Sequence, residues 1–164
     1  MPHPSPGRIP LRVKGLLVAF FLSAFAKIGQ ITIIGKQVYD MTGRELDLGL
    51  IGLAEFLPAM LVAPLAGALA DRVDRRRMFA LALTGEATVS ALLFWYASTG
   101  PTSVLPIFLL VFLFGICQGF TAPSGRALPI DMSPTALVPR VVALEHVAFQ
   151  AGLIAGPVAF GFLF

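Results

Sequence analysis

The stretch LVAPLAGALADRVDRRRMFALAL, residues Leu61–Leu83, carries charge only in its middle. Four arginines and two aspartates fall between Gly67 and Phe79, and long apolar runs flank them on both sides. Two apolar runs of membrane-spanning length leave room for only a tight turn between them. We therefore predict two membrane helices joined by a short charged turn at the membrane surface.

The composition of the whole chain supports a membrane protein. Of its 164 residues, 57% are hydrophobic and 13% are charged, whereas soluble domains have about 45–50% and about 25%. The net charge of +3 does not indicate nucleic-acid binding, because the basic residues are spread thinly beside apolar runs. We expect no nucleic-acid partner and a chain embedded in a lipid bilayer.

Five apolar stretches are long enough to cross a bilayer, whose hydrocarbon core requires roughly twenty residues per helix. They nearly fill the chain, so no stretch is left for a soluble domain. The sequence thus predicts an all-α membrane protein with a tail at residues 1–13 and helices over residues 14–164. The predicted helices are Lys14–Val38, Leu48–Ala70, Met78–Ala97, Val104–Leu128 and Val141–Phe164.

The basic residues predict how the chain is oriented. Positive side chains are enriched in cytoplasmic loops, and only Lys36 and Arg44 flank the predicted helices on one side. We therefore predict a multi-pass protein of the cell (inner) membrane with a cytoplasmic N-terminus. The other, cytoplasmic side gathers Arg8, Arg12, Lys14, Arg72, Arg75, Arg76, Arg77, Arg126 and Arg140.

Small residues lead into the charged turn. Ala59, Ala63 and Gly67 are spaced four apart, and such a stripe lets a neighbouring helix approach closely. Asp71 comes one turn later, where its carboxylate can accept hydrogen bonds from a nearby helix N-terminus. The arginines that follow can pair with carboxylates or lipid phosphates, or they can serve only as topology and headgroup anchors.

This turn resembles the loop signature of the major facilitator superfamily, glycine-x-leucine-alanine-aspartate-arginine-x-glycine-arginine-lysine or arginine. Asp74 stands where the family usually has its second glycine, as is common in the drug-efflux and siderophore-exporter branch. The resemblance implies that Asp71 and Arg72 help to lock a cytoplasmic gate in one conformation. The residues that match the signature are Gly67, Leu69, Ala70, Asp71, Arg72, Arg75 and Arg76.

Two further segments were compared with the same family. The run AGLIAGPVAFGF in the last predicted helix is similar to a glycine-proline motif of exporters, through Gly152, Gly156 and Pro157, although generic small-residue packing explains it equally well. In the fourth predicted helix, FLFGICQG resembles an arginine-x-x-glutamine-glycine motif, but Gly115 occupies the arginine position. That departure argues against proton coupling at this point.

Charged residues inside apolar runs are candidate functional residues by default. At about 1.5 Å per residue, Lys27 lies about 18 Å and Glu55 about 22 Å from the cytoplasmic ends of their helices. We predict a buried ion pair between them, or two groups lining one cavity. The pair is either structural, or Glu55 is a proton or cation-substrate site whose ionisation Lys27 adjusts. For Glu86 we expect a structural hydrogen bond.

Gln30 and Gln118 are polar groups that can orient a ligand or join helices. We expect no enzyme, because the chain has no HExxH, G-x-S-x-G or P-loop pattern. With one cysteine, Cys117, a cysteine-based metal site within the chain is excluded, and we expect no metal or cofactor.

Together these features lead to one interpretation and one alternative. The resemblance implies the N-terminal portion of a secondary exporter of small amphipathic molecules, which works by alternating access and whose missing C-terminal half completes the cavity. Proton coupling is an open possibility, for which Glu55 is the candidate. The alternative is a truncated membrane fragment or assembly partner that does not transport.

Overall fold

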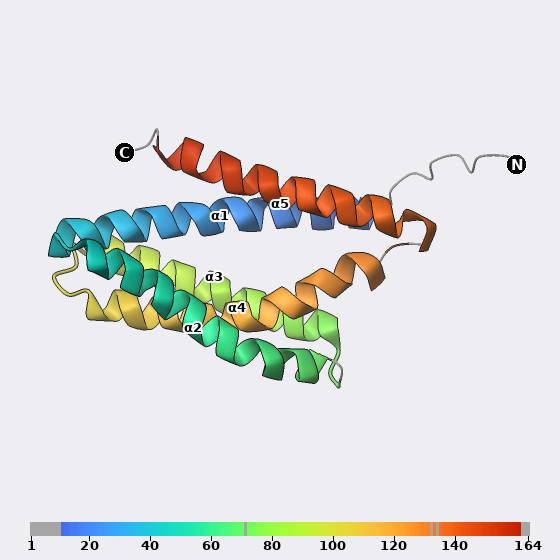
Figure 1. Ribbon diagram of the computed structural model, residues 1–164, viewed down its shortest axis with the longest axis horizontal. Helices are drawn as coiled ribbons and strands as arrows, with labels where there is room; N and C mark the ends of the chain where they lie inside the picture. The colour runs from blue at the N-terminus through green and yellow to red at the C-terminus, as the bar shows by residue number, and fades with distance from the viewer. Residues whose placement is uncertain (1–10, 71, 132, 134, 162–164) are drawn as a thin grey trace, which may run out of the picture. The chain divides into compact units, whose positions relative to one another are not determined.

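The computed structural model describes residues 11–70, 72–131, 133 and 135–161. These residues form five long α-helices and one short 3-10 helix, and no strand occurs among them (Figure 1). The all-α prediction is confirmed, and each long helix contains a stretch long and apolar enough to cross a membrane. The elements are α1 (Leu11–Thr42), α2 (Glu45–Ala70), α3 (Arg75–Ser98), α4 (Leu105–Asp131), η1 (Thr135–Leu137) and α5 (Val138–Gly161).

The helices begin and end at residues somewhat different from those that hydropathy marks. Helix α1 begins at Leu11 rather than Lys14 and ends at Thr42 rather than Val38, and α3 begins at Arg75 rather than Met78. Hydropathy detects the lipid-embedded part of a helix, whereas backbone hydrogen bonding continues through charged flanks. The predicted end of the last helix, Phe164, lies outside the described residues.

Glycines in the left-handed conformation follow two of the helices. Gly43 has a φ of 65° and its backbone N–H donates to the Tyr39 carbonyl at 2.8 Å, which caps the end of α1. Gly100 has a φ of 67° just beyond α3. Glycine takes this conformation without the steric cost that a Cβ would add. Both glycines therefore permit the sharp turns that separate consecutive membrane helices.

The chain divides into two compact units, and each is described here by itself. The first unit contains residues 1–30 and 127–164, so it holds the first part of α1 together with α5. Gly152 of α5 lies against Phe21, and Gly156, one turn later, lies against Phe25 and Ile28. Because the contacts advance in the same direction along both helices, α1 and α5 run parallel (Figure 1).

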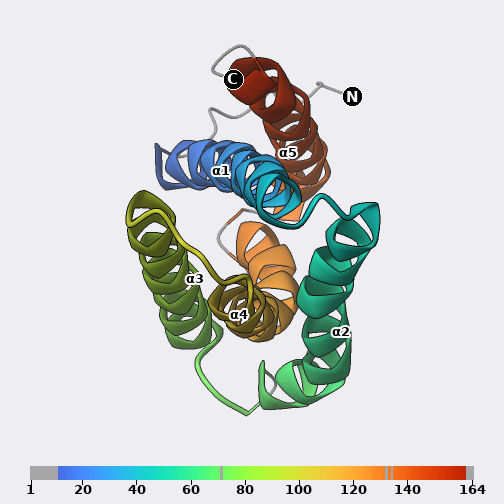
Figure 2. The same cartoon turned by 90° about the vertical axis from the view of Figure 1, so that its left-hand side faces the viewer.

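The second unit contains residues 31–126, with α2, α3, most of α4 and the end of α1. Figure 2 shows that α4 lies between α2 and α3. Many other large apolar side chains on these helices, such as Leu61 and Phe94, are exposed, as expected for surfaces that face lipid. The buried core of this unit consists of Ile34, Val38, Ile51, Val89, Leu93, Ile107, Val111 and Phe114.

Candidate functional site

A groove of about 580 Å³ runs along α2 and α4 in the second unit. We call it the α2–α4 groove. Its α2 wall is made of two adjacent rows of residues spaced four apart, and its α4 wall of residues at one turn of that helix. The lining residues are Gly52, Glu55, Phe56, Ala59, Met60, Ala63 and Pro64 from α2, and Gln118, Gly119 and Ala122 from α4.

Two glycines of α4 set the distance between the walls of this groove. A Cβ atom at Gly115 would overlap the Glu55 carbonyl oxygen and lie 2.8 Å from Cγ of Pro58. A Cβ atom at Gly119 would lie 2.9 Å from the Ala59 carbonyl oxygen and 3.1 Å from Cβ of Val62. Gly115 and Gly119 thus let the α4 backbone lie directly against the α2 backbone, in the manner of small-xxx-small helix pairs.

This packing gives a physical reason for glycine at the position where the family motif has arginine. Since even a methyl group at Gly115 would overlap the α2 backbone, an arginine there would require α2 and α4 to move apart. The comparison of FLFGICQG with a charged motif therefore missed its structural role. The four-residue spacing of Gly115 and Gly119 was the sequence signal that could have revealed it.

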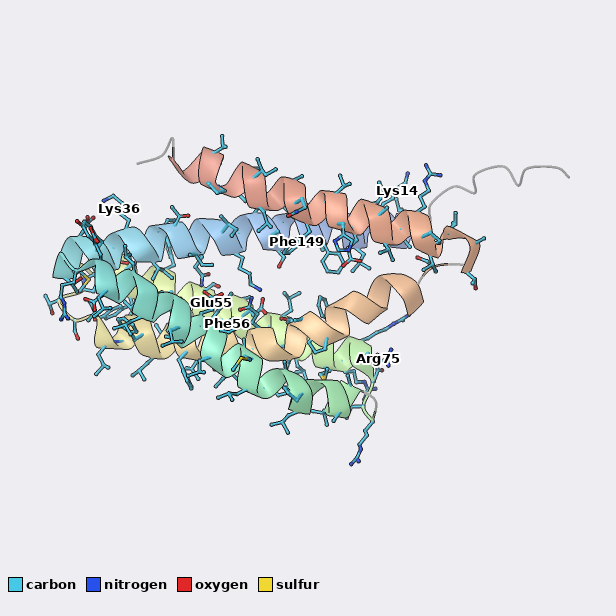
Figure 3. All side chains as sticks on the ribbon, in the orientation of Figure 1. Lys14, Lys36, Glu55, Phe56, Arg75 and Phe149 are labelled. Carbon is cyan, nitrogen blue, oxygen red and sulfur yellow. The ribbon has the colours of Figure 1, made fainter. Side chains whose placement is uncertain are left out.

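Glu55 and Gln118, both expected from the sequence to be functional candidates, line the same groove. Glu55 is half-buried, and Figure 3 shows it beside Phe56 on α2. The remaining lining residues are apolar or glycine. The groove therefore presents one carboxylate and one amide on a largely apolar surface, which is the usual composition of a small-molecule site. The α2 residues Phe56, Met60 and Pro64 were not predicted, although their four-residue spacing was visible in the sequence.

On its other side, α4 holds a buried acidic group of α3. The hydroxyl of Thr121 donates to Oε1 of Glu86 at 2.5 Å, and both side chains are buried. The structural hydrogen bond expected for Glu86 is thus confirmed. Next to this pair, a Cβ atom at Gly85 would lie 2.7 Å from the Cys117 sulfur, so α3 and α4 also approach closely here. Helix α4 is therefore held from both sides.

The charged turn contains α2–α3 contacts that the sequence did not predict. Asp74 is the N-cap of α3, because its side chain accepts a hydrogen bond from the Arg76 backbone N–H at 2.9 Å. This capping role explains aspartate where the family usually has glycine. Nε of Arg75 donates to the Ala70 carbonyl at 3.3 Å and so joins the end of α2 to the start of α3 (Figure 3).

The gating residues of this turn remain a prediction. Asp71 lies outside the described residues, and Arg72 is exposed. Gly67 differs from expectation, since no described atom lies within 4 Å of the place that its Cβ would take. The close helix approach predicted along its stripe occurs instead at Ala59, against α4. The stripe was read correctly as small but its contacting part lies farther from the turn.

The glycines of the last helix lie against α1 in the first unit. A Cβ atom at Gly152 would lie 2.6 Å from the Phe21 carbonyl oxygen, and one at Gly156 would lie 3.2 Å from the Phe25 carbonyl oxygen. Pro157 lies on the exposed side of α5, inside the helix. Of the two interpretations of this motif, close helix packing is the one that these contacts display.

Lys27 and Gln30 also belong to the first unit, whereas Glu55 and Gln118 belong to the second. Lys27 is half-buried. The ion pair predicted between Lys27 and Glu55 therefore stays a prediction. Among the described residues, no group of three or more histidine, cysteine, aspartate or glutamate side chains is placed to hold a metal ion.

Comparison with known proteins identifies the class and then the family. Five membrane-spanning helices define a multi-pass membrane protein. Residues 16–164 match the family described as the Major Facilitator Superfamily. The chain belongs to this family of membrane transporters rather than to a class of enzymes.

Two curated relatives carry the same description, "Multi-drug resistance efflux pump PmrA", and come from the TIGR4 and R6 strains of Streptococcus pneumoniae. Each is 29% identical over 151 residues, which cover 88% of this chain. The chain spans 37% of the length of these relatives. No solved structure matches the chain significantly.

Proposed function

We propose that this chain forms part of a secondary active transporter that exports small amphipathic molecules across the cell membrane. The observation that carries the proposal is the family match over residues 16–164, together with relatives described as multidrug efflux pumps. The α2–α4 groove supports it, because an apolar surface with a few polar groups suits amphipathic ligands. A second, C-terminal half would complete the cavity of such a transporter, in which two repeats rock around a central site.

The proposed orientation places the α2–α3 turn in the cytoplasm. Within the second unit, Arg72, Arg75, Arg76 and Arg77 lie at one end of the helices, whereas Lys36 and Arg44 lie at the other. Lys36 is paired with Asp40 at 2.6 Å, which reduces the positive charge of that end further. By the positive-inside rule, the arginine-rich end faces the cytoplasm.

The gate is proposed to depend on the charged turn. In this proposal Asp71 and Arg72 stabilise the state in which the cytoplasmic side is closed, as the resemblance to the family signature implies. Arg75 contributes by holding the α2 and α3 ends together through the Ala70 carbonyl. Transport is proposed to be driven by an ion gradient, with protons as the coupling ion and Glu55 as the residue that binds them.

Export can be tested in drug-sensitive bacteria that express the complete reading frame containing this sequence. Cells are loaded with a fluorescent amphipathic dye, energised, and followed for dye release. We expect release that stops when the proton gradient is collapsed, and we expect Asp71→Asn to slow it at least about tenfold, since a gate loses a charged hydrogen-bond partner. The matched control is Asp40→Asn, whose exposed ion pair with Lys36 contributes little.

Three results would count against the proposal. Dye release that is no faster than in cells without the protein would favour a fragment or assembly partner that does not transport. Equal release by Asp71→Asn and wild type would remove the gate assignment. Unchanged transport and pH dependence in Lys27→Met would show that Lys27 does not adjust a coupling group.

A further inference from the structure

We propose that the α2–α4 groove binds lipophilic organic cations, with the Glu55 carboxylate as their counter-charge. This inference deepens the proposed export function and rests on it for its physiological meaning. It concerns binding at one place in the chain, so it can be tested without measuring export. Anions and neutral molecules of the same size are expected to bind more weakly.

The charge of the groove carries the first step. Glu55 is the one ionisable residue among those that line it, and no lysine, arginine or histidine is among them. A carboxylate far from the ends of a membrane helix is costly and is retained where it has a partner or a ligand. Because attraction between charges is strong where water is scarce, a monocation in the groove gains far more from Glu55 than from an exposed carboxylate.

The backbone of α2 adds a second acceptor to the same groove. Pro64 has no N–H, so it cannot donate to the carbonyl of Met60, four residues earlier in the helix. Both residues line the groove. The carbonyl dipole of Met60 therefore places further partial negative charge on the α2 wall. The amide oxygen of Gln118 offers another acceptor on the α4 wall.

The rest of the groove fits an apolar ligand body. Phe56 is 63% exposed and Met60 is 49% exposed, so both large side chains are available for contact. An aromatic face attracts a nearby cation through its quadrupole, and methionine adapts to ligands of different shape. The volume of about 580 Å³ lies within the range of about 300–1,000 Å³ that is usual for small-molecule pockets. A cation with several aromatic rings is therefore the class of ligand that matches size, charge and surface.

The test uses two probes with the same shape and opposite charge, tetraphenylphosphonium and tetraphenylborate. The complete protein is purified in detergent, and binding of labelled tetraphenylphosphonium is measured by equilibrium dialysis. We expect saturable binding that tetraphenylborate does not displace at concentrations where unlabelled tetraphenylphosphonium displaces it fully. We expect Glu55→Gln to lower the affinity about tenfold or more.

Two matched controls separate charge from fold. Glu45→Gln removes an exposed carboxylate from the first turn of the same helix and should leave the affinity unchanged. Ala122→Trp fills the groove from α4 and should abolish binding, whereas Leu81→Trp adds similar bulk on an exposed face of α3 and should not. If Glu55→Gln fails to fold, Glu55→Asp, which keeps the charge, should retain binding, and Ala122→Trp decides the location.

Each contrary result has a distinct meaning. Equal affinity in Glu55→Gln and wild type would overturn the role of Glu55, and unchanged binding in Ala122→Trp would overturn the location. Displacement by tetraphenylborate at equal concentration would overturn the preference for cations. Binding that behaves as expected in a protein without dye export would support this inference and contradict the proposed function instead.

Discussion

Two helix pairs in this chain are packed by the same device with different results. In the first unit Gly152 and Gly156 of α5 lie against α1, and in the second unit Gly115 and Gly119 of α4 lie against α2. Both pairs run parallel and both use glycines four residues apart.

The groups that face the glycines distinguish the pairs. The α5 glycines meet Phe21, Ala24, Phe25 and Ile28, all of them apolar residues. The α4 glycines meet a segment that contains Glu55 and Pro58. Close packing alone therefore specifies a pair of helices, and a candidate site arises only where the partner helix also carries an ionisable group and broken backbone hydrogen bonding.

The largest effect is expected for Gly115→Ala. The added methyl group would overlap the Glu55 carbonyl and crowd Pro58, so α4 must move away from α2. We expect a loss of about 2–3 kcal/mol, which is near the upper end for overpacking. Thermal unfolding of the purified protein in detergent measures it. A variant as stable as wild type would show that the α2–α4 contact does not have the tightness described.

Gly152→Ala is the corresponding change in the other pair, and it should cost less. Its Cβ would lie 2.6 Å from the Phe21 carbonyl oxygen and 2.8 Å from Cβ of Ala24. We expect a loss of about 1–2 kcal/mol by the same unfolding assay, with cation binding to the α2–α4 groove retained. If this variant lost binding while Gly115→Ala kept it, the assignment of packing and site to the two pairs would be reversed.

Thr121→Val removes a hydrogen bond from the pair that contains the site. Valine has a similar shape to threonine but cannot donate to Glu86, which is only 6% exposed. Leaving a buried polar group without this donor should cost about 1–3 kcal/mol. Thr121→Ser, which keeps the hydroxyl, is the control and should lie close to wild type in apparent melting temperature. Equal values for the two variants would mean that the hydrogen bond contributes nothing to the α3–α4 contact.

The smallest effect, with the opposite sign, is expected for Gly67→Ala. No described atom lies within 4 Å of the added methyl group, and alanine favours the helix over glycine. We expect a gain of about 0.5–1 kcal/mol in stability. Dye export supplies a second readout, because a more stable but slower variant would indicate that Gly67 meets another helix during the transport cycle. A destabilised variant would contradict the open surroundings described for this glycine.

The number and type of helices followed directly from the sequence. Apolar runs of membrane length, separated by charged or glycine-containing turns, permit few other structures in a bilayer. The α2–α3 turn was placed correctly, because the arginines at Arg72 and Arg75 interrupt two long apolar runs. The N-cap at Asp74 was missed, although an aspartate just before a predicted helix is a known start signal.

The contacts between helices could not be predicted in the same way. These helices are apolar on nearly all sides, so no amphipathic pattern distinguishes the face toward protein from the face toward lipid. For that reason the small stripe on α2 was expected to pack at Gly67, whereas its close contact is at Ala59. The meeting of Glu55 with Gln118 in one groove depends on the position of α4, which spacing along α2 does not contain.

The length of α1 has a consequence for the membrane itself. Lys14 and Lys36 are both exposed and stand about 33 Å apart along this helix at 1.5 Å per residue, while the hydrocarbon layer is about 30 Å thick. The two ammonium groups thus mark a span that nearly matches the lipid. In a thinner bilayer α1 would have to tilt or its lysines would have to reach outward, so the activity of this protein should depend on acyl-chain length through hydrophobic mismatch.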